Sequence, residues 1–411
     1  MNRDQIAELE KHVLIPTYDR LPILAVGGEG CYIYDETKKK YLDFLGGLAV
    51  NSLGYNHPEI MATVRDGAES LLHVSNLLYH RYQAPLAEKL TRLSGMDRAF
   101  FANSGTEAIE GAMKLARAYA RQHAAPGPFD RFEILALENS FHGRTFGALS
   151  ATWPKKYREP FEPLPPGVRF VRLNDTAHLH ESFTPQVTAV MVEVIQGEGG
   201  VVEVHEDFLK AAAELCHTHG ALLICDEIQC GLGRTGRMFA YTKFGLQPDI
   251  VVVSKPLAAG LPLAAILARE EVAQAFSPGM HGTTVGGGPL QCRVALKVLE
   301  ILERPGFLAH VTSVGAYFRQ ELEKLRAALP VIKEVRGDGL MVAAELTTSG
   351  KPVVNQALEA GLLINCTQEK VLRFLPPLII EKQHVDEAIG VLGPILAALE
   401  PAAAMKKGVN A

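Results

Sequence analysis

The sequence predicts an α/β fold built on a mostly parallel β-sheet, and two apolar segments carry this prediction. Residues 250–253 read Ile-Val-Val-Val, a β-branched run typical of a strand that is buried on both faces. A second run, residues 221–225, precedes it by roughly thirty residues, about the length of one βαβ unit. Asp226 follows the earlier run and Lys255 follows the later one. Open α/β sheets bind ligands at the carboxyl ends of their strands, so we expect both side chains to face one crevice.

An acid and a lysine in one crevice suit pyridoxal phosphate (PLP). Desolvation lowers the pKa of a lysine, and the neutral amine is a nucleophile toward carbonyl groups. PLP takes a lysine at its aldehyde and an acidic partner at its ring nitrogen. The alternative for Lys255 alone is a lysine that ends a strand at the surface. The neighbouring Asp226 favours the PLP hypothesis.

Length and composition predict two domains and exclude several classes of protein. The chain has 411 residues, is 47% hydrophobic and carries a formal net charge of −5, which leaves no nucleic-acid footprint. We expect a large domain at residues 57–311 and a small α+β domain at residues 1–56 and 312–411. The N-terminus lacks the apolar core of a signal peptide, and the longest apolar stretch, residues 256–268, is too short for a membrane. Six cysteines without a Cys-x-x-Cys pair predict reduced thiols, no zinc site and a cytoplasmic protein.

The next expected strand, residues 99–102, leads into a polar turn and a helix that extends to about Arg121. Ser104, Gly105 and Thr106 stand at the start of that helix. Backbone N–H groups and hydroxyls at a helix N-terminus form a phosphate cradle, helped by the helix dipole. The alternative is a plain capping box between Ser104 and Glu107. The same residues can serve both roles.

Two further predicted strands carry, or lead into, side chains that are candidates for ligand binding. After the strand at residues 134–137 come Phe141, His142 and Arg144, which can stack on a ring and bind a carboxylate. Core packing and a solvated charge are the alternatives for Phe141 and Arg144. We expect residues 187–195 to form one strand with Glu193 inside it, and a buried glutamate there needs a partner.

Several segments are expected to be loops. Residues 46–54 follow a predicted hairpin at residues 31–45, and residues 71–79 suit either a site loop or a helix cap at Ser75 or Asn76. Residues 281–289 form a hydroxyl-rich stretch suited to phosphate, or else a plain glycine-rich connection. We expect a surface loop at residues 123–130 and disorder at residues 402–411. Residues 231–236 match Gly-x-Gly-x-x-Gly, but they do not close the first strand of a βαβ unit, so a nicotinamide enzyme is a weak alternative.

The motifs of the chain, taken in order, resemble one known family over nearly its full length. They are Tyr41–Asn51, Phe101–Ala108, Ser140–Thr145, Ile195–Gly200, Asp226–Gly236 and Leu372–Leu378. This set is similar to the class III, fold-type I PLP-dependent aminotransferases, and within them to the acetylornithine aminotransferases. The resemblance implies an aspartate aminotransferase-like fold with a mostly parallel seven-stranded sheet. It also implies a homodimer with its active site at the subunit interface.

The resemblance assigns roles to individual residues. Lys255 would bind the PLP aldehyde and move the proton, Asp226 would pair with the ring nitrogen, and Gln229 would lie near the ring hydroxyl. Phe141 and Ile228 would hold the ring between them. Gly105 and Thr106 would bind the phosphate, joined by Thr284 of the neighbouring subunit. Arg144 would bind the distal carboxylate of the substrate. Arg373 would bind the α-carboxylate of glutamate or 2-oxoglutarate, and Glu198 would be its movable partner.

The implied reaction moves an amino group from N²-acetyl-L-ornithine to 2-oxoglutarate, as in arginine biosynthesis. Other ω-amino donors remain open, namely ornithine, succinylornithine, succinyl-diaminopimelate, 4-aminobutyrate and a carrier-bound lysine. An aminomutase and a catalytically dead relative are alternatives of other classes. The chain departs from the family pattern at Val194, Pro256 and Gly288, where relatives often have Pro, Ala and Asn. None of these changes removes a catalytic group.

Overall fold

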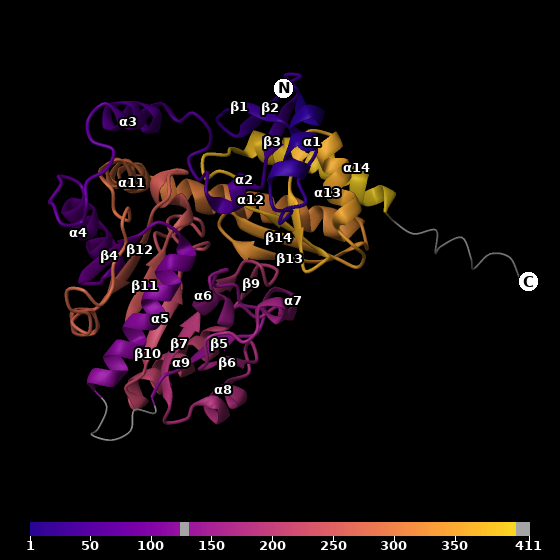
Figure 1. Ribbon diagram of the computed structural model, residues 1–411. Coiled ribbons are helices and arrows are strands. Elements are labelled where there is room, and N and C mark those ends of the chain that lie inside the picture. Colours follow the sequence, from indigo (N-terminus) through magenta and orange to yellow (C-terminus); the bar gives the residue numbers. More distant parts are fainter. Residues whose placement is uncertain (124–130, 400–411) are drawn as a thin grey trace, which may run out of the picture.

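The computed structural model describes residues 1–123 and 131–399, and a seven-stranded sheet forms its centre (Figure 1). Within the sheet β10 pairs in parallel with β7 and β11, and β5 pairs in parallel with β6 and β7. β12 runs antiparallel to both of its neighbours, β4 and β11. The predicted α/β class and the seven-stranded, mostly parallel sheet are thus confirmed. In spatial order the strands are β4 (Arg98–Ala102), β12 (Ala264–Ala268), β11 (Ile250–Val253), β10 (Leu222–Asp226), β7 (Val187–Val192), β5 (Glu133–Leu137) and β6 (Val168–Val171).

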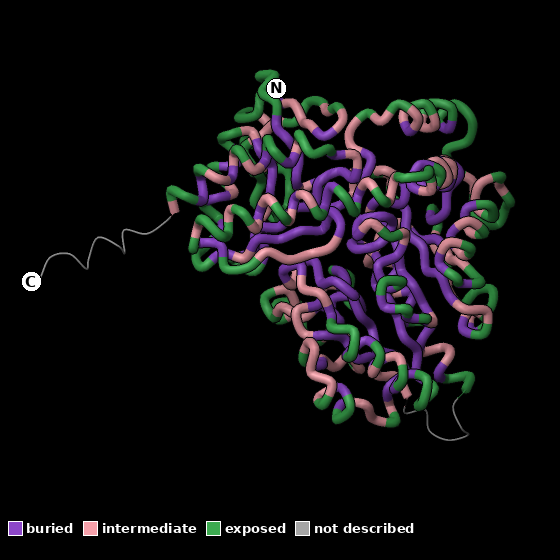
Figure 2. Tube along the Cα trace, turned by 180° about the vertical axis from the view of Figure 1, so that it is seen from behind, coloured by how far each residue is buried: buried purple, intermediate pink, exposed green. Residues whose placement is uncertain are grey.

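The central strands are buried along their whole length because helices cover the sheet. Every residue of β7, β10 and β11 is buried, as the purple tubes of Figure 2 show. Helix α5 (Gly105–Gln122) buries a face of small and aliphatic side chains that includes Ala108, Ile109 and Ala112. The other helices of this part are α3 (Pro58–Ala68), α4 (Gln83–Ser94), α6 (Phe146–Ser150), α7 (Lys155–Arg158), α8 (Thr176–Ser182), α9 (Glu206–His219), α10 (Glu270–Ala273) and α11 (Pro289–Leu302). Short elements complete it: the 3-10 helices η1 (Glu159–Phe161), η2 (Ala240–Phe244) and η3 (Lys255–Ala258), and the hairpin of β8 (Ile195–Gln196) with β9 (Val202–Glu203).

The two terminal parts of the described chain lie side by side and form two further four-stranded sheets (Figure 1). Strands from both parts meet in the first of these sheets. One sheet joins β1 (Ala25–Glu29), β2 (Tyr32–Asp35) and β3 (Lys40–Asp43) to β15 (Leu362–Leu363), which pairs in parallel with β3. The other has the order β13 (Ile332–Asp338), β14 (Met341–Leu346), β17 (Val371–Phe374) and β16 (Asn365–Thr367). Their helices are α1 (Arg3–Val13), α2 (Gly46–Ala49), α12 (Phe307–Ala328), α13 (Lys351–Glu359) and α14 (Lys382–Ala398). The domain boundaries at residues 56/57 and 311/312 stay a proposal.

The structure corrects two expectations about local structure. Residues 187–195 do not form one strand: β7 ends at Val192, and Glu193 lies between β7 and β8. The segment at residues 46–54 is not entirely a loop, since it begins with α2, in which Gly47 and Leu48 have left-handed backbone angles. Gly46 is required there because a Cβ atom would overlap the carbonyl oxygen of Leu375. The predicted hairpin is confirmed by the antiparallel pairing of β2 with β3.

The Gly-x-Gly-x-x-Gly segment has a packing role in the structure. It does not start an α-helix, so the context of a dinucleotide site is missing. Its Arg234 is fully buried and donates to the carbonyl oxygens of Leu340 and Pro376 at 3.0 and 2.6 Å. Arg234 therefore ties the segment that follows β10 to the small sheet that contains β13, β14 and β17.

The expected loop after His123 and the expected disorder at residues 402–411 lie outside the described residues. Among helices in residues 1–123 and 131–399, none combines the length and the apolar character needed to cross a membrane.

Candidate active site

The carboxyl ends of the parallel strands border a cavity of about 250 Å³. Lys255 and Asp226 both line it, so the crevice expected from the two strand ends is present. Gly143 and Ser254 also line it, although the sequence did not single them out. Most of the other predicted site residues lie here as well: Gly105, Thr106, Phe141, His142, Arg144, Glu193, Glu198, Ile228 and Gln229. Their individual roles stay predictions.

Lys255 is held in a strained and desolvated position. It begins η3 with a φ angle of 31°, in the left-handed region that costs a residue with a Cβ roughly 1–2 kcal/mol. Such strain is found where surrounding structure fixes a functional side chain. Burial, together with the positive charge of Arg373, lowers the pKa of Lys255 from its ordinary value. The environment thus favours the neutral amine that attacks carbonyl groups.

Asp226 has a buried partner that the sequence did not pair with it. His142 Nδ1 lies 2.8 Å from Asp226 Oδ2, and both side chains are almost completely buried. Burial alone would lower the pKa of His142, but the hydrogen bond and the charge of Asp226 raise it. The second oxygen of Asp226 accepts a hydrogen bond from the backbone N–H of Ile228 at 3.0 Å. The carboxylate is therefore fixed at its position in the cavity.

Glu193 finds the partner that its burial requires in the backbone. Its carboxylate accepts from the N–H groups of Phe141 at 2.9 Å and Gly197 at 3.4 Å. Burial raises the pKa of Glu193 to about 7, although the nearby His142 opposes the shift. These backbone contacts hold the side chain of Glu193 at the cavity wall, just beyond the end of β7 at Val192.

The start of α5 shows that the capping alternative is correct and leaves the phosphate hypothesis open. Ser104 and Glu107 form a capping box, with Glu107 N donating to Ser104 Oγ at 3.4 Å. Ser104 is absent from the cavity wall, whereas Gly105 and Thr106 line it. A Cβ atom on Gly105 would lie 2.9 Å from Ile228 Cδ1, so a side chain there would displace Ile228 from the cavity wall. The helix N-terminus therefore presents N–H groups that suit a phosphate.

The small sheet brings Arg373 to two residues of the cavity wall, Glu198 and Gln229, although Arg373 itself does not line the cavity. Arg373 on β17 donates from one terminal nitrogen to Glu198 Oε1 at 2.6 Å and approaches Gln229 Oε1 at 3.3 Å. Its side chain is 1% exposed, while that of Glu198 is 31% exposed. The contact was predicted from the glycine-flanked position of Glu198 at a strand end together with the family resemblance.

Arg144 lies at another part of the cavity wall and stacks on an aromatic ring that the sequence analysis missed. Its guanidinium carbon is 3.7 Å from the ring centre of Tyr157 and 5.4 Å from that of Phe141. Tyr157 belongs to α7, whose residues Lys155 to Arg158 read as a solvated surface helix. A sequence in which basic residues surround the tyrosine gives no indication that its ring lies near an active site.

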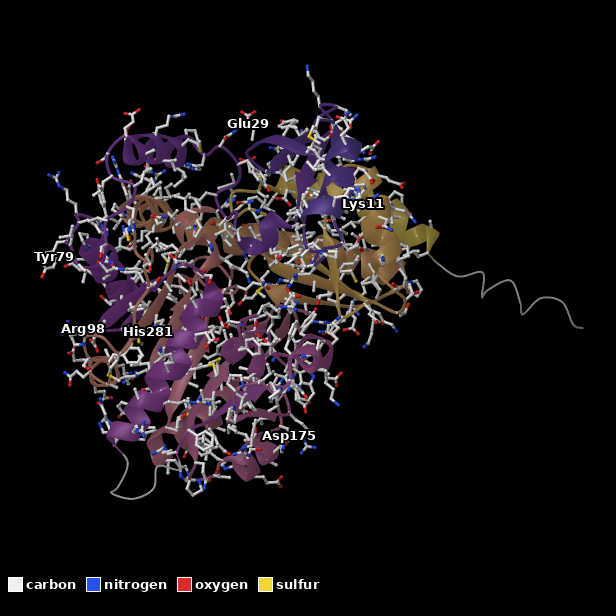
Figure 3. All side chains as sticks on the ribbon, in the orientation of Figure 1. Lys11, Glu29, Tyr79, Arg98, Asp175 and His281 are labelled. Carbon is white, nitrogen blue, oxygen red and sulfur yellow. The ribbon has the colours of Figure 1, made fainter. Side chains whose placement is uncertain are left out.

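Thr284, like Ser104 and Arg373, is a predicted site residue that does not line the cavity of its own chain. It is exposed, on a loop that Asn76 holds by donating to the carbonyl oxygens of Thr283 and Gly286. Residues 71–79 form neither a helix nor part of the cavity wall, so neither alternative for that segment is met in the single chain. Tyr79 and His281 lie on the same side of the molecule (Figure 3).

The chemistry of the cavity fits PLP. An acid, a lysine with a lowered pKa and an uncovered helix N-terminus suit the ring nitrogen, the aldehyde and the phosphate, respectively.

Comparisons with known proteins agree with this chemistry. Residues 14–396 match the family model described as aminotransferase class-III. The chain is 46% identical over 400 residues to the acetylornithine aminotransferase of Methanocaldococcus jannaschii, covering 97% of this chain and 100% of that one. It is 48% identical over 384 residues to the acetylornithine aminotransferase of Aquifex aeolicus, covering 93% and 99%. The ornithine aminotransferase of Toxoplasma gondii superposes with a TM-score of 0.93 at 33% identity, covering 97% and 96% of the two chains. A second structure of that enzyme describes partial occupancy of PLP at its active site.

Proposed function

This chain belongs to the class-III aminotransferases, which depend on PLP, and we propose that its amino donor is N²-acetyl-L-ornithine. The acceptor is 2-oxoglutarate, and the products are N-acetyl-L-glutamate 5-semialdehyde and L-glutamate. The names of the relatives at 46% and 48% identity support this choice of donor. The observation that carries the proposal is a pair of arginines: Arg144 lines the cavity, and Arg373 is paired with Glu198, which lines it too.

The surroundings of Lys255 and Asp226 determine the role that we assign to each. PLP, when bound, supplies the aldehyde that takes up the amino group and a ring that withdraws electrons. Lys255 accepts and returns the proton at the reacting carbon, since its lowered pKa favours the neutral amine. Asp226, which is fixed by His142, would hold a proton at the ring nitrogen.

The remaining contacts hold the cofactor in place. Phe141 and Ile228 would hold the ring between them, and Gln229 would lie near its hydroxyl. Gly105 and Thr106, which line the cavity at the start of α5, would bind the phosphate.

The two arginines separate the carboxylates of the two substrates. Acetylornithine reacts at its terminal amine, so its carboxylate lies far from the reacting carbon and binds Arg144. Glutamate and 2-oxoglutarate react next to the α-carboxylate, which binds Arg373, while the second carboxylate takes Arg144. Glu198 pairs with Arg373 when no α-carboxylate is present, because an unpaired buried charge is costly.

We also propose that the enzyme works as a homodimer. Large apolar side chains are exposed on one segment, including Leu72, Leu77 and Tyr79, and Val285 is exposed beside Thr284. Exposed apolar groups of this size are typical of a protein interface. In the dimer Thr284 would bind the phosphate in the neighbouring subunit. A cytoplasmic location stays a prediction.

A donor screen tests the proposal. Acetylornithine, ornithine, succinylornithine and 4-aminobutyrate are each supplied with 2-oxoglutarate, and glutamate formation is followed. We expect the highest kcat/KM with acetylornithine. Equal kcat/KM values with ornithine and acetylornithine would contradict the choice of donor. Isomerisation of the donor without 2-oxoglutarate would indicate an aminomutase.

A further inference from the structure

Tyr157 is the aromatic side chain nearest to the guanidinium of Arg144. The guanidinium carbon lies 3.7 Å from the centre of its ring, a distance at which the two planar groups are in contact. Tyr157 also packs edge-on against Phe141, with ring centres 6.3 Å apart and an angle of 90° between the planes. One ring therefore touches both the arginine and the aromatic residue that line the cavity.

Within the described part of the chain, the guanidinium of Arg144 has no ion pair and no hydrogen bond. The backbone N–H of Arg144 does donate a hydrogen bond, to Thr106 Oγ1 at 3.2 Å. Aromatic contacts are consequently what orients the side chain. A ring against the face of a guanidinium leaves the N–H groups at its edge free, and these are the groups that bind a carboxylate in a bidentate manner.

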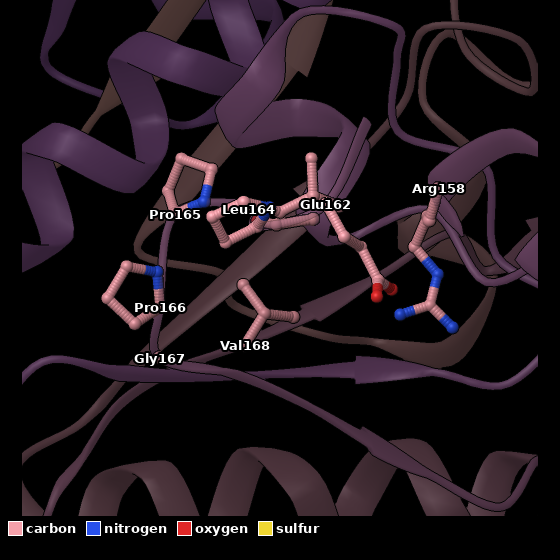
Figure 4. A pocket seen from close by; sticks show the side chains of 9 residues that line it. Arg158, Glu162, Leu164, Pro165, Pro166, Gly167 and Val168 are labelled. Carbon is pink, nitrogen blue, oxygen red and sulfur yellow. The ribbon is translucent and has the colours of Figure 1, made fainter. Parts of the chain in front are cut away.

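The helix that carries Tyr157 is itself anchored. Arg158 donates from Nε to the carbonyl oxygen of Trp153 at 3.2 Å, and its guanidinium lies 4.8 Å from the ring centre of Phe170. Trp153 in turn donates its backbone N–H to the carbonyl oxygen of Ser140 at 2.9 Å, directly before Phe141. Arg158 also borders a separate surface hollow of about 380 Å³ at the proline-rich segment 163–166 (Figure 4). This anchoring gives Tyr157 a fixed position relative to the cavity.

We propose that Tyr157 is a positioning residue for carboxylate recognition: it holds Arg144 with its N–H edge toward the distal carboxylate of the substrate. The inference rests on the proposed role of Arg144. It adds a residue that determines specificity through Arg144. Because the contact is made by the face of the ring, the phenol hydroxyl is not required for it.

Two donors that differ by one carboxylate test this inference. N-acetylputrescine is acetylornithine without its α-carboxylate, so it needs no arginine at the distal end. Tyr157→Leu should raise the KM for acetylornithine roughly fivefold, the loss expected for one cation–π contact. The kinetic constants with N-acetylputrescine should not change. Tyr157→Phe should retain the preference for the carboxylated donor.

A binding measurement provides a readout without turnover. The affinity for glutarate, an unreactive dicarboxylate, is measured by calorimetry and should fall by a similar factor in Tyr157→Leu. Phe132→Leu is the matched control, because it removes a ring 5.9 Å from the guanidinium of Arg117, near the carboxyl end of α5. It should leave both readouts unchanged.

Arg144→Gln separates failure of the inference from failure of the proposed function. If Arg144→Gln does not lower the preference for acetylornithine over N-acetylputrescine, the role of Arg144 is wrong. If it does, but Tyr157→Leu leaves that preference and glutarate binding intact, the positioning role of Tyr157 is refuted. An equal loss with both donors in Tyr157→Leu also refutes it.

Discussion

Removing Glu198 should change which substrate the enzyme prefers more than its overall rate. In the structure Glu198 Oε1 lies 2.6 Å from Arg373, whose side chain is 1% exposed. The other side-chain contacts of Arg373 are the neutral oxygens of Asn365 and Gln229, both at 3.3 Å. Glu198→Ala therefore leaves a buried cation that only the α-carboxylate of glutamate or 2-oxoglutarate can neutralise.

The size of the effect follows from the contact that is lost. A hydrogen bond to a charged group contributes about 1.5–3 kcal/mol, which corresponds to roughly 10- to 150-fold in a rate ratio. We expect the glutamate half-reaction to gain on the acetylornithine half-reaction by a factor in this range. Glu198 also raises the pKa of Lys255, so its removal alters the amine for both donors. The ratio of the two half-reactions cancels that shared effect.

The assay is a single turnover with each donor, followed by the change in cofactor absorbance. Glu198→Gln is a useful second variant, because it keeps the shape and a hydrogen-bonding oxygen but removes the charge. It should move the ratio in the same direction by a smaller factor. If both half-reactions change equally, or if the preference moves toward acetylornithine, the proposed exchange of partners at Arg373 is wrong.

Three further predictions concern the cofactor and the fold. Borohydride reduction should fix the cofactor on Lys255, and peptide mapping to another lysine would overturn that assignment. Asp226→Asn should retain the cofactor but slow turnover by several powers of ten in a steady-state assay, and a loss of less than about tenfold, or 1.4 kcal/mol, would contradict the role of the carboxylate. Gly315→Ala should destabilise the protein by about 1–3 kcal/mol in urea unfolding, because the new Cβ would overlap the backbone of Gly339. The control Gly390→Ala, where nothing lies within 4 Å, should be neutral or stabilising by up to about 1 kcal/mol.

The sequence predicts the groups that stand at strand ends, because their positions depend on local rules. Buried runs identify β10 and β11, and parallel pairing brings Asp226 and Lys255 to one edge. Glu193 was misplaced because the apolar run continues through Val194 and Ile195, although β7 stops at Val192. Glu193 accepts a hydrogen bond from the backbone N–H of Phe141, 52 residues away, and no periodicity encodes such a contact.

Contacts between distant segments need the folded chain. Arg373 and Glu198 are 175 residues apart in the chain, and the family resemblance was needed to connect them. Tyr157 was missed because its neighbours are Lys155, Lys156 and Arg158, a composition typical of an exposed helix. Its contact with Arg144 exists because the chain between them folds back over the end of β5.

The one antiparallel strand of the large sheet acts as a spacer. β12 lies between β4, which leads to the turn at Gly105, and β11, which leads to Lys255. Neighbouring strands are roughly 4.8 Å apart, so the insertion separates those two strand ends by about 10 Å, whereas Asp226 on β10 is only one spacing from β11. The strand order of the sheet thus sets the distance between Lys255 and the N-terminus of α5. The connection between η3 and β12 can change length without altering that distance, whereas loss of β12 would shorten it by one strand spacing.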